Sequence, residues 1–163
     1  MNVSIVIPFY NEEDNVEQLV SEVVAVPLED HELEVILVDD GSSDSTWQKI
    51  QSCAAQHDAV RGARCPVNQG QSSALYHGLH AATGAVLVTL DGDLQNDPAD
   101  IPALLKALDQ HDVACGYRAN RRDSWSRRVG SRLANRVRNW VTHDGIRDTG
   151  CGLKAFRKAC LSD

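Results

Sequence analysis

Short strand-like runs recur along the first 116 residues, and each of the first four is followed by a polar turn and a segment with the pattern of a helix. The runs are short, contain β-branched side chains and are bounded by turn-forming residues, as is typical of buried strands. The pattern therefore predicts strands at 3–8, 35–38, 60–65, 85–90 and 113–116, and helices at 12–25 and from about residues 44, 71 and 98.

This alternation predicts an α/β fold. Strands that alternate with helices of this length form right-handed βαβ units, which build a mostly parallel central sheet with helices on both faces, a Rossmann-like architecture. In such sheets ligands bind beyond the carboxyl ends of the strands. The acidic pairs at 39–40 and 91–93 follow two of the predicted strands, so we expect both pairs at that edge.

Length and composition predict one globular domain spanning residues 1–163. The chain is 42% hydrophobic, yet its apolar runs fall far short of the roughly 20 residues of a transmembrane helix. The segment near Met1 is a strand followed by polar residues rather than a signal peptide, so a cytoplasmic location is expected. Five dispersed cysteines without a CxxC motif argue against disulfides and zinc, and predict buried reduced thiols.

The net charge of −7 is distributed unevenly. Residues 1–115 hold 4 Lys and Arg against 19 Asp and Glu, whereas residues 116–163 hold 12 against 4. The basic part is expected to face an anionic group. The acidic remainder would repel a long polyanion, which favours a small phosphorylated ligand or an anionic membrane surface over nucleic acid.

The stretch VTLDGDLQNDP places Asp91 and Asp93 at the end of a predicted buried strand. Like charges repel there and burial disfavours ionisation, so a bound cation is the expected compensation. Carboxylates of this kind suit Mg²⁺ or Mn²⁺, and Gln95 can add a neutral oxygen ligand. The alternative is that these aspartates only end a strand and cap a helix, because a lone DxD motif is weak.

Asp39 and Asp40 end another apolar run and continue into GSSDST. Carboxylates in this position can accept hydrogen bonds from a ribose hydroxyl or a base N–H. The same segment can also simply turn the chain and cap the next helix through Ser43 or Asp44. Both interpretations can hold together. Neither a P-loop nor a GxGxxG motif is present.

A basic amphipathic helix is predicted within residues 124–141. Its apolar residues form one stripe, and Arg128, Arg132 and Arg136 follow a four-residue spacing elsewhere on its surface. The helix can be a solvated element packed on the sheet. Its arginines can also bind phosphate or lie at a layer of lipid head groups.

Together these motifs resemble the family 2 glycosyltransferases with a GT-A fold, particularly those that transfer sugars to polyprenyl phosphates. The resemblance covers nearly the whole chain, and its specificity comes from the order and spacing of motifs that are individually loose. The motifs are VSIVIPFYNEEDN, VDDGSSDST, NQGQSSALYHGLHAATG, LDGDLQNDP and DTGCGLKAFRK. The chain ends earlier than the family's catalytic domain normally does, so a C-terminally truncated domain is expected.

The resemblance also implies roles for individual residues. Asp93 is implied to be catalytic as well as a metal ligand. Asp148 would organise Lys154 or an arginine, or act as a base towards a hydroxyl acceptor. Leu153 stands where relatives often carry an aromatic residue. The other implied roles are the nucleoside site (Pro8, Tyr10, Asn11, Glu12, Asp39, Asp40), the metal site (Asp91, Asp93, Gln95) and the acceptor phosphate site (Arg118, Arg127, Ser131, Lys154).

The implied reaction is an inverting displacement that moves a sugar from a UDP- or GDP-sugar to a polyprenyl phosphate, at the cytoplasmic face of a membrane. A metal would stabilise the leaving diphosphate. A phosphate acceptor is largely dianionic at neutral pH, so no strong base is needed. The alternatives are a hydroxyl acceptor in cell-wall or polysaccharide synthesis, a phosphatase using Asp91 as nucleophile, and a non-catalytic nucleotide-sugar-binding or receiver-like module.

Overall fold

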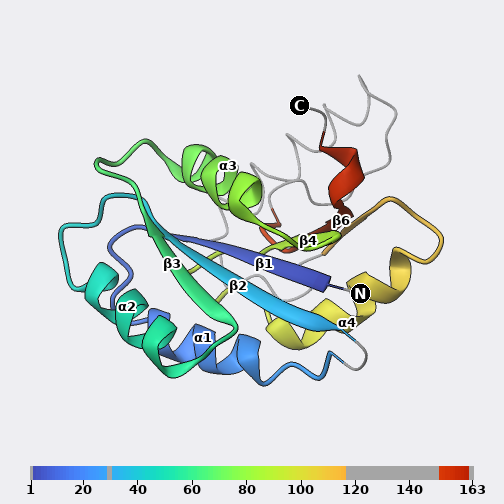
Figure 1. The fold of residues 1–163 in the computed structure, drawn as a ribbon, viewed down its shortest axis with the longest axis horizontal. Helices are drawn as coiled ribbons and strands as arrows, with labels where there is room; N and C mark the ends of the chain where they lie inside the picture. Colours follow the sequence, from blue (N-terminus) through green and yellow to red (C-terminus); the bar gives the residue numbers. More distant parts are fainter. Residues whose placement is uncertain (1, 29–30, 117–150, 162–163) are drawn as a thin grey trace, which may run out of the picture.

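The computed structural model describes residues 2–28, 31–116 and 151–161 (Figure 1). Strands and helices alternate as the sequence predicts. The elements are β1 (Asn2–Phe9), α1 (Val16–Val24), β2 (Glu32–Asp39), α2 (Thr46–Gln56), β3 (Val60–Arg64), α3 (Gln71–Ala81), β4 (Val86–Thr89), η1 (Pro98–Asp100), α4 (Ile101–Ala107), β5 (Val113–Cys115), β6 (Lys154–Arg157) and η2 (Lys158–Cys160).

The described residues form one six-stranded sheet in the order β3-β2-β1-β4-β6-β5. Strands β1 to β4 pair in parallel, whereas β6 runs antiparallel to both β4 and β5. The prediction of a mostly parallel α/β sheet is confirmed. Strand β6 was not predicted, because its four residues carry a basic side chain at each end and show no strand pattern of their own.

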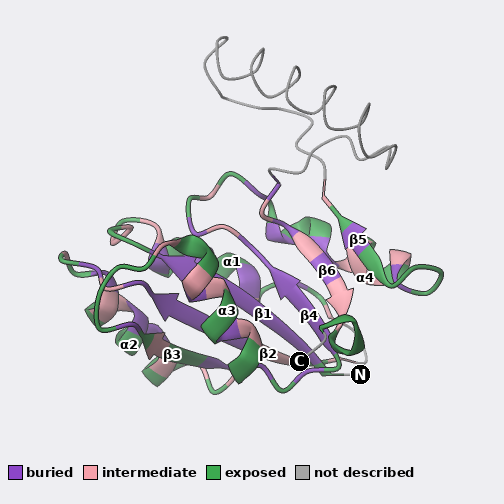
Figure 2. Ribbon diagram, turned by 90° about the horizontal axis from the view of Figure 1, so that it is seen from above, coloured by how far each residue is buried: buried purple, intermediate pink, exposed green. Residues whose placement is uncertain are grey.

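Helices cover both faces of the sheet, as predicted. Helices α1, α2 and α4 lie on one face and α3 lies on the other (Figure 1). Side chains alternate along β1: Ile5 and Ile7 pack with α1 and α2, while Val6 packs with α3. Figure 2 shows that the central strands are almost wholly buried. Central strands covered on both faces read as continuous apolar runs, which is why the sequence identified them.

Helix α1 begins at Val16, later than the predicted start at residue 12. Its buried residues Val16, Leu19, Val20 and Val23 follow helical spacing, so the apolar stripe was identified correctly. Residues 12–15 instead form a turn closed by a 3.0 Å hydrogen bond from Asn15 N–H to the Glu12 carbonyl. Sequence periodicity could not locate this start, because the turn is held by contacts with a distant loop.

Strand β1 lies at the point where the direction of sheet growth reverses. The chain first adds β2 and β3 on one side of β1, and then crosses over to add β4 on the other side. The connections leaving β1 and β4 therefore diverge at their carboxyl ends. Such a switch point is where open α/β sheets form a ligand crevice.

The cysteine prediction is partly wrong. Cys53, Cys65 and Cys151 are buried, but Cys115 and Cys160 are exposed, and all five thiols are free. Burial raises the pKa of Cys53 and Cys65 above the usual value, which keeps both as protonated apolar side chains at neutral pH. The two exposed cysteines lie at the edge strand β5 and in η2, where little of the chain covers them.

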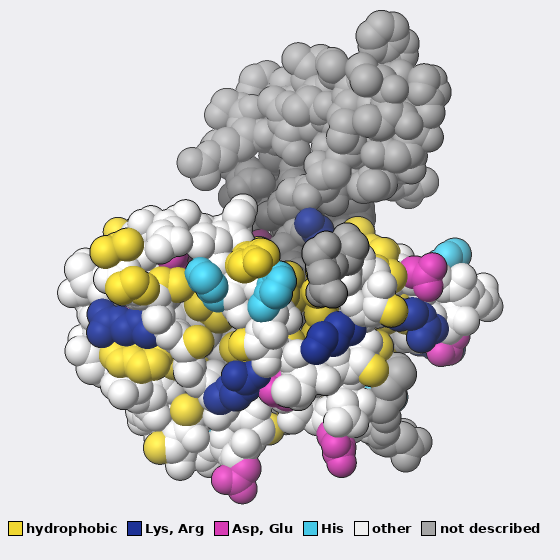
Figure 3. All heavy atoms as spheres, turned by 45° about the horizontal axis from the view of Figure 1, so that its top comes forward, with side chains coloured by type: hydrophobic (Ala, Val, Ile, Leu, Met, Phe, Trp, Pro, Cys, Tyr) yellow, Lys and Arg dark blue, Asp and Glu magenta, His cyan; other side chains and the backbone are white. Residues whose placement is uncertain are grey.

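No helix in the described part of the chain is both long and apolar enough to cross a bilayer. On the face seen in Figure 3, the coloured Lys and Arg side chains lie apart from one another, and some of them lie beside Asp or Glu side chains. Most of the basic segment 116–163, including the predicted helix within 124–141, lies outside the described residues.

Candidate functional site

A cleft of about 490 Å³ opens at the carboxyl ends of β1, β2 and β4. It lies at the switch point between β1 and β4, where the topology favours ligand binding. Residues from four separate segments meet in it. The lining residues are Pro8, Phe9, Tyr10, Glu12, Asp40, Asn68, Gly70, Gln71, Asp91, Gly92 and Asp93.

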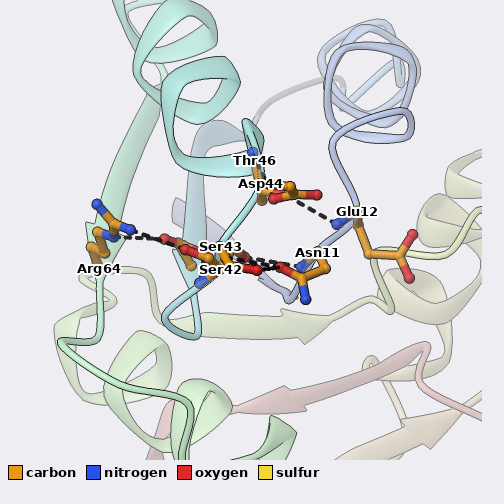
Figure 4. A network of polar contacts seen from close by, with 8 residues as sticks. Asn11, Glu12, Ser42, Ser43, Asp44, Thr46 and Arg64 are labelled. Carbon is orange, nitrogen blue, oxygen red and sulfur yellow. Dashed lines mark hydrogen bonds and ion pairs between the residues drawn. The ribbon is translucent and has the colours of Figure 1, made fainter.

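The loops after β1 and β2 are joined by a network of hydrogen bonds (Figure 4). Asn11 N–H donates to Ser42 Oγ at 3.0 Å, and the Asn11 side-chain oxygen accepts from Ser43 N–H at 2.9 Å. Asn11 has a φ of 52°, a left-handed conformation that asparagine tolerates better than most residues. Its side chain is therefore engaged in joining the loops, and it is not among the cleft-lining residues.

Glu12 is anchored by its backbone and leaves its carboxylate towards the cleft. Its N–H donates to Thr46 Oγ1 at 2.9 Å. The carboxylate points away from this network in Figure 4 and accepts a hydrogen bond from the Asn15 side-chain amide. Tyr10, which also lines the cleft, is exposed. Tyr10 and Glu12 thus offer an aromatic ring and an acceptor to a ligand.

Asp44 contacts the start of α2, but the N-cap residue is Ser45, whose side chain makes no capping hydrogen bond, so neither Ser43 nor Asp44 occupies the predicted cap position. Its carboxylate accepts from Thr46 N–H at 3.0 Å and from Glu13 N–H at 3.4 Å. Desolvation raises the pKa of Asp44, but the hydrogen bonds from Thr46 and Glu13 outweigh it and leave the pKa below its usual value. Ser43 instead contacts Asn11, so the two candidates have different partners.

Asp39 is completely buried and is not a cleft-lining residue. One carboxylate oxygen accepts from Ser42 N–H at 3.0 Å, and Oδ2 lies 2.9 Å from Arg64 Nε in an ion pair. The Arg64 contact is not an aligned hydrogen bond, so among the described residues Oδ2 has no hydrogen-bond partner. Asp39 therefore supports the loop after β2 from within.

Asp40 faces the cleft and fixes the loop that leads into α3. Its two oxygens accept from Gln69 N–H at 3.0 Å and Gly70 N–H at 2.8 Å. Gly41, with a φ of +71°, packs so closely that a Cβ would lie 2.6 Å from Asn68 N. Neighbouring acidic residues thus have separate roles, because alternate residues of a strand face opposite sides of the sheet.

Asp91 and Asp93 reach the same cleft as Asp40. Asp91 Oδ1 accepts a 2.7 Å hydrogen bond from Gln71 Nε2, and Asp93 is exposed with Oδ1 accepting from Gln95 N–H at 3.1 Å. The Gln95 side chain is exposed and does not line the cleft. The two carboxylates of the DxD motif therefore face one space.

Two glycines allow this arrangement. A Cβ at Gly92 would lie 2.7 Å from the Phe9 ring, so glycine lets the loop approach the end of β1. A Cβ at Gly152 would lie 2.0 Å from the Asp91 carboxylate, which the backbone of residue 152 therefore covers. Thr89 Oγ1 donates to the Gly152 carbonyl at 2.7 Å and holds that backbone in place.

The donor set fits a hard divalent cation. Two carboxylates face one open cleft, and Asp91 packs directly against the backbone of Gly152, which a side chain at position 152 would prevent. Within the described ranges no group of three or more His, Cys, Asp or Glu side chains is placed so that it could hold a metal ion by itself. Such a cation would take its other ligands from water or from a bound diphosphate, as Mg²⁺ sites commonly do.

The family described as glycosyl transferase family 2 matches residues 4–162. The chain belongs to this family. The resemblance inferred from the sequence motifs is therefore confirmed, and the structural relatives share the α/β arrangement of the sheet and helices.

A curated relative of this family 2 glycosyltransferase is the undecaprenyl-phosphate 4-deoxy-4-formamido-L-arabinose transferase of Edwardsiella ictaluri. It is 40% identical over 163 residues, which make up 98% of this chain and 50% of the relative. The chain thus spans about half the length of the curated relative that it matches.

Two solved structures show the same fold. Glucosyl-3-phosphoglycerate synthase from Mycobacterium tuberculosis, in complex with Mn²⁺, UDP-glucose and phosphoglyceric acid, has a TM-score of 0.75 and 23% identity, covering 98% of this chain and 57% of the other. A mannosyltransferase from Pyrobaculum calidifontis, in complex with GDP-Man and Mn²⁺, has a TM-score of 0.66 and 21% identity, covering 95% and 44%.

Several implied site residues of the family 2 glycosyltransferase are not placed in the cleft. Lys154 begins β6, opposite Thr89, and is half-buried without lining the cleft. The residues Arg118, Arg127, Ser131 and Asp148 lie outside the described residues.

The structure also adds residues that sequence reasoning did not select, Phe9 of β1 among them. Asn68, Gly70 and Gln71 line the cleft, and Gly152 covers Asp91. The only sequence signal for Asn68, Gly70 and Gln71 is a polar, glycine-containing stretch directly before a predicted helix. Gly152 carries no local signal, because its role depends on a residue 61 positions away in the chain.

Proposed function

We propose that this protein transfers a sugar from a nucleotide-diphosphate sugar to a polyprenyl phosphate by a metal-assisted inverting displacement. The observation that carries the proposal is the convergence of Asp40, Asp91 and Asp93 in one cleft at the switch point of the sheet. The curated relative, whose name joins an arabinose derivative to undecaprenyl phosphate, supports the acceptor class. The Mn²⁺ complexes of the structural relatives, with UDP-glucose or GDP-Man, support the donor class.

The donor's nucleoside is proposed to lie along the loops after β1 and β2. Tyr10 and Glu12 supply the ligand-facing side chains, and Pro8 lines the cleft beside them. Asp40 offers a carboxylate in the same wall, while Asn11 and Asp39 hold the two loops in register. A ring for stacking and acceptors for ribose hydroxyls are the groups that a nucleoside requires.

The diphosphate is proposed to lie near Asp91 and Asp93, which would hold Mg²⁺ or Mn²⁺. A divalent cation bound there would neutralise charge on the leaving nucleoside diphosphate. In this proposal Asp93 is catalytic because it would hold the cation that stabilises the leaving diphosphate. Its exposure leaves room for a ligand beside it.

The acceptor is proposed to react as a phosphate dianion, which is the main form of a phosphate monoester at neutral pH because its second pKa is about 6. No side chain then has to remove a proton. Lys154 and the arginines and serine outside the described residues are proposed to hold this phosphate, with Asp148 orienting Lys154 or an arginine. The basic segment 116–163 is proposed to contact a membrane at its cytoplasmic face.

Thermal shift measurements with UDP and GDP sugars, with and without Mn²⁺, test the donor and metal parts. We expect a rise in melting temperature that requires Mn²⁺, because a ligand selective for the folded state stabilises it by mass action. Asp93→Asn should abolish the Mn²⁺-dependent shift. Its stability without ligand should stay within about 0.5 kcal/mol of the wild type, since Asp93 is exposed.

Asp100→Asn is the matched control, because Asp100 is an exposed carboxylate in the same part of the chain that does not line the cleft. It should behave as the wild type. The proposal is wrong if no nucleotide sugar gives an Mn²⁺-dependent shift, or if Asp93→Asn and Asp100→Asn respond alike.

Transfer of labelled sugar to undecaprenyl phosphate tests the acceptor part in the full-length protein. Appearance of label in the lipid fraction would support the polyprenyl phosphate acceptor. Label on a polysaccharide hydroxyl would move the function to cell-wall or polysaccharide synthesis, and Mn²⁺-dependent donor binding without turnover would favour a sensing module.

A further inference from the structure

We infer that Gln71 is a positioning residue for Asp91, and that its amide sets the affinity of the cleft for the divalent cation. The inference rests on the proposed function and assigns a role to a residue that the DxD motif does not contain. The central observation is the 2.7 Å hydrogen bond from Gln71 Nε2 to Asp91 Oδ1 inside the cleft that both residues line.

The backbone of Gln71 is held in place from the cleft side. Asp40 accepts hydrogen bonds from the two preceding backbone amides, those of Gln69 and Gly70, at 3.0 and 2.8 Å. Gly41 packs against the same loop, with a Cβ at that position only 2.6 Å from Asn68 N. The backbone of Gln71, the first residue of α3, is therefore held in a fixed position. Its side chain reaches Asp91 by rotation about its own torsion angles alone.

Asp91 is held from a second direction as well. The Gly152 backbone covers its carboxylate so closely that a Cβ would lie within 2.0 Å of Cγ. That backbone is itself tied to β4 by the hydrogen bond from Thr89 Oγ1 to the Gly152 carbonyl. The carboxylate thus lies between the amide of Gln71 and the backbone of Gly152, and both contacts select its orientation.

The hydrogen bond is compatible with metal binding. An ionised carboxylate offers about four acceptor positions, so Asp91 can accept from Gln71 and still ligate a cation. Partners of this kind orient a metal ligand, and their loss typically weakens metal affinity about 10- to 100-fold. Asp93 is exposed, and its contact among the described residues is with a backbone amide of its own loop, so the orientation of Asp91 is more tightly fixed than that of Asp93.

Gln71→Met tests the inference, because methionine has nearly the same shape but no amide donor. The Mn²⁺ concentration that gives half of the thermal shift with UDP or GDP should rise about 10- to 100-fold. A titration with Mn²⁺ alone, followed by the electron paramagnetic resonance of the free ion, should show the same loss. At saturating Mn²⁺ the nucleotide affinity should return to within about twofold of the wild type.

Gln71→Asn is a second variant that keeps the amide but shortens its reach by one methylene, and it should resemble Gln71→Met. Gln56→Ala is the control, since Gln56 is an exposed glutamine at the far end of α2 whose amide contacts Ser52 Oγ. It should leave the Mn²⁺ midpoint unchanged.

The outcomes separate this inference from the proposed function. A wild type without any Mn²⁺-dependent nucleotide shift overturns both. A wild type that responds, with Gln71→Met and Gln71→Asn variants that respond at the same Mn²⁺ concentration, overturns only the role of Gln71. Nucleotide affinity that stays weak at saturating Mn²⁺ also overturns it, because Gln71 would then contact the nucleotide directly.

Discussion

Asp39 and Asp40 are adjacent in the chain and chemically identical, yet their side chains have different surroundings. Both are buried, but Asp39 contacts Arg64 and Ser42, whereas Asp40 lines the cleft and binds two loop amides. The difference follows from strand geometry, because successive side chains point to opposite faces. The motif therefore combines a residue that supports the loop, Asp39, with a residue that lines the cleft, Asp40. Substitution of Asp39 should mainly change stability, whereas substitution of Asp40 should also change the cleft.

Replacing Arg64 tests the support role of Asp39. Arg64→Met leaves a buried carboxylate oxygen without its only charged partner among the described residues, so the free energy of unfolding should fall by about 1–3 kcal/mol in urea titrations. Lys49→Met breaks the pair with Glu17, whose side chain is 61% exposed, and should cost about 0–1 kcal/mol. Equal losses in the two variants would contradict the support role.

At the scale of elements, the edge opposite the cleft is held by a polar network around Glu34 of β2. The Glu34 carboxylate accepts hydrogen bonds from Ser4 Oγ of β1, from Arg61 Nε of β3 at 3.0 Å and from Thr83 N–H at 2.9 Å. Ser4 Oγ in turn accepts from Gly84 N–H at 2.8 Å. One side chain thereby joins three strands to the connection between α3 and β4.

The stability that this network supplies should depend on pH. Burial raises the pKa of Glu34, but the hydrogen bonds from Ser4, Thr83 and Arg61 outweigh it, so the pKa lies below its ordinary value of 4.5. A carboxylate whose pKa is lowered by folding stabilises the protein above the unfolded value. That contribution is lost as the pH falls through the folded value.

Glu34→Gln should therefore be less stable than the wild type at pH 7, and the difference should shrink as the pH falls below about 4.5. Urea titrations between pH 7 and pH 3 measure this difference. Glu22→Gln, at an exposed position of α1, serves as the control and should change stability little at any pH. A difference between Glu34→Gln and wild type that stays constant down to pH 3 would argue against the network.

Close packing between elements also constrains α3. A Cβ at Gly78 would lie 2.3 Å from Val6 Cγ1 and 3.0 Å from Val38 Cγ2, so the helix approaches the sheet through a position without a side chain. This approach brings the start of α3, and with it Gln71, to the edge where Asp91 lies. Nothing in the local sequence pattern around Gly78 shows which residues it meets.

At the scale of the whole molecule, stability should decrease from the central strands to the sheet edges. Strands β1 and β4 are buried and paired on both sides, whereas the edge strands β3 and β5 expose part of their residues. Amide hydrogen exchange should therefore be slowest in β1, β2 and β4 and clearly faster in β5. Uniform exchange rates across all strands would show that the sheet opens as a single unit.

Ligand binding should change this pattern selectively. Nucleotide with Mn²⁺ would bridge loops that follow β1, β2 and β4, so added protection should appear in those loops. The amino-terminal edge, where the Glu34 network lies, is at the opposite end of the strands from the cleft and should gain protection only through the overall stabilisation.

The sequence by itself determined the fold class, the family, and the positions of most strands and helices. Buried parallel strands are continuous apolar runs, and the helix α1 shows its buried stripe directly in its spacing. The acidic motifs were also visible, because carboxylates directly after such runs must lie at the carboxyl edge of the sheet.

Only the tertiary structure decided what each of those carboxylates contacts. Antiparallel β6, the late start of α1, the burial of Asp39 and the cover of Gly152 over Asp91 all depend on contacts between residues far apart in the chain. Local patterns record the period of an element and the face that it buries, but they carry no information about which distant backbone or side chain arrives there. The hydrogen bond between Gln71 and Asp91 also depends on distant parts of the chain, because it forms only once α3 packs on the sheet that contains β4.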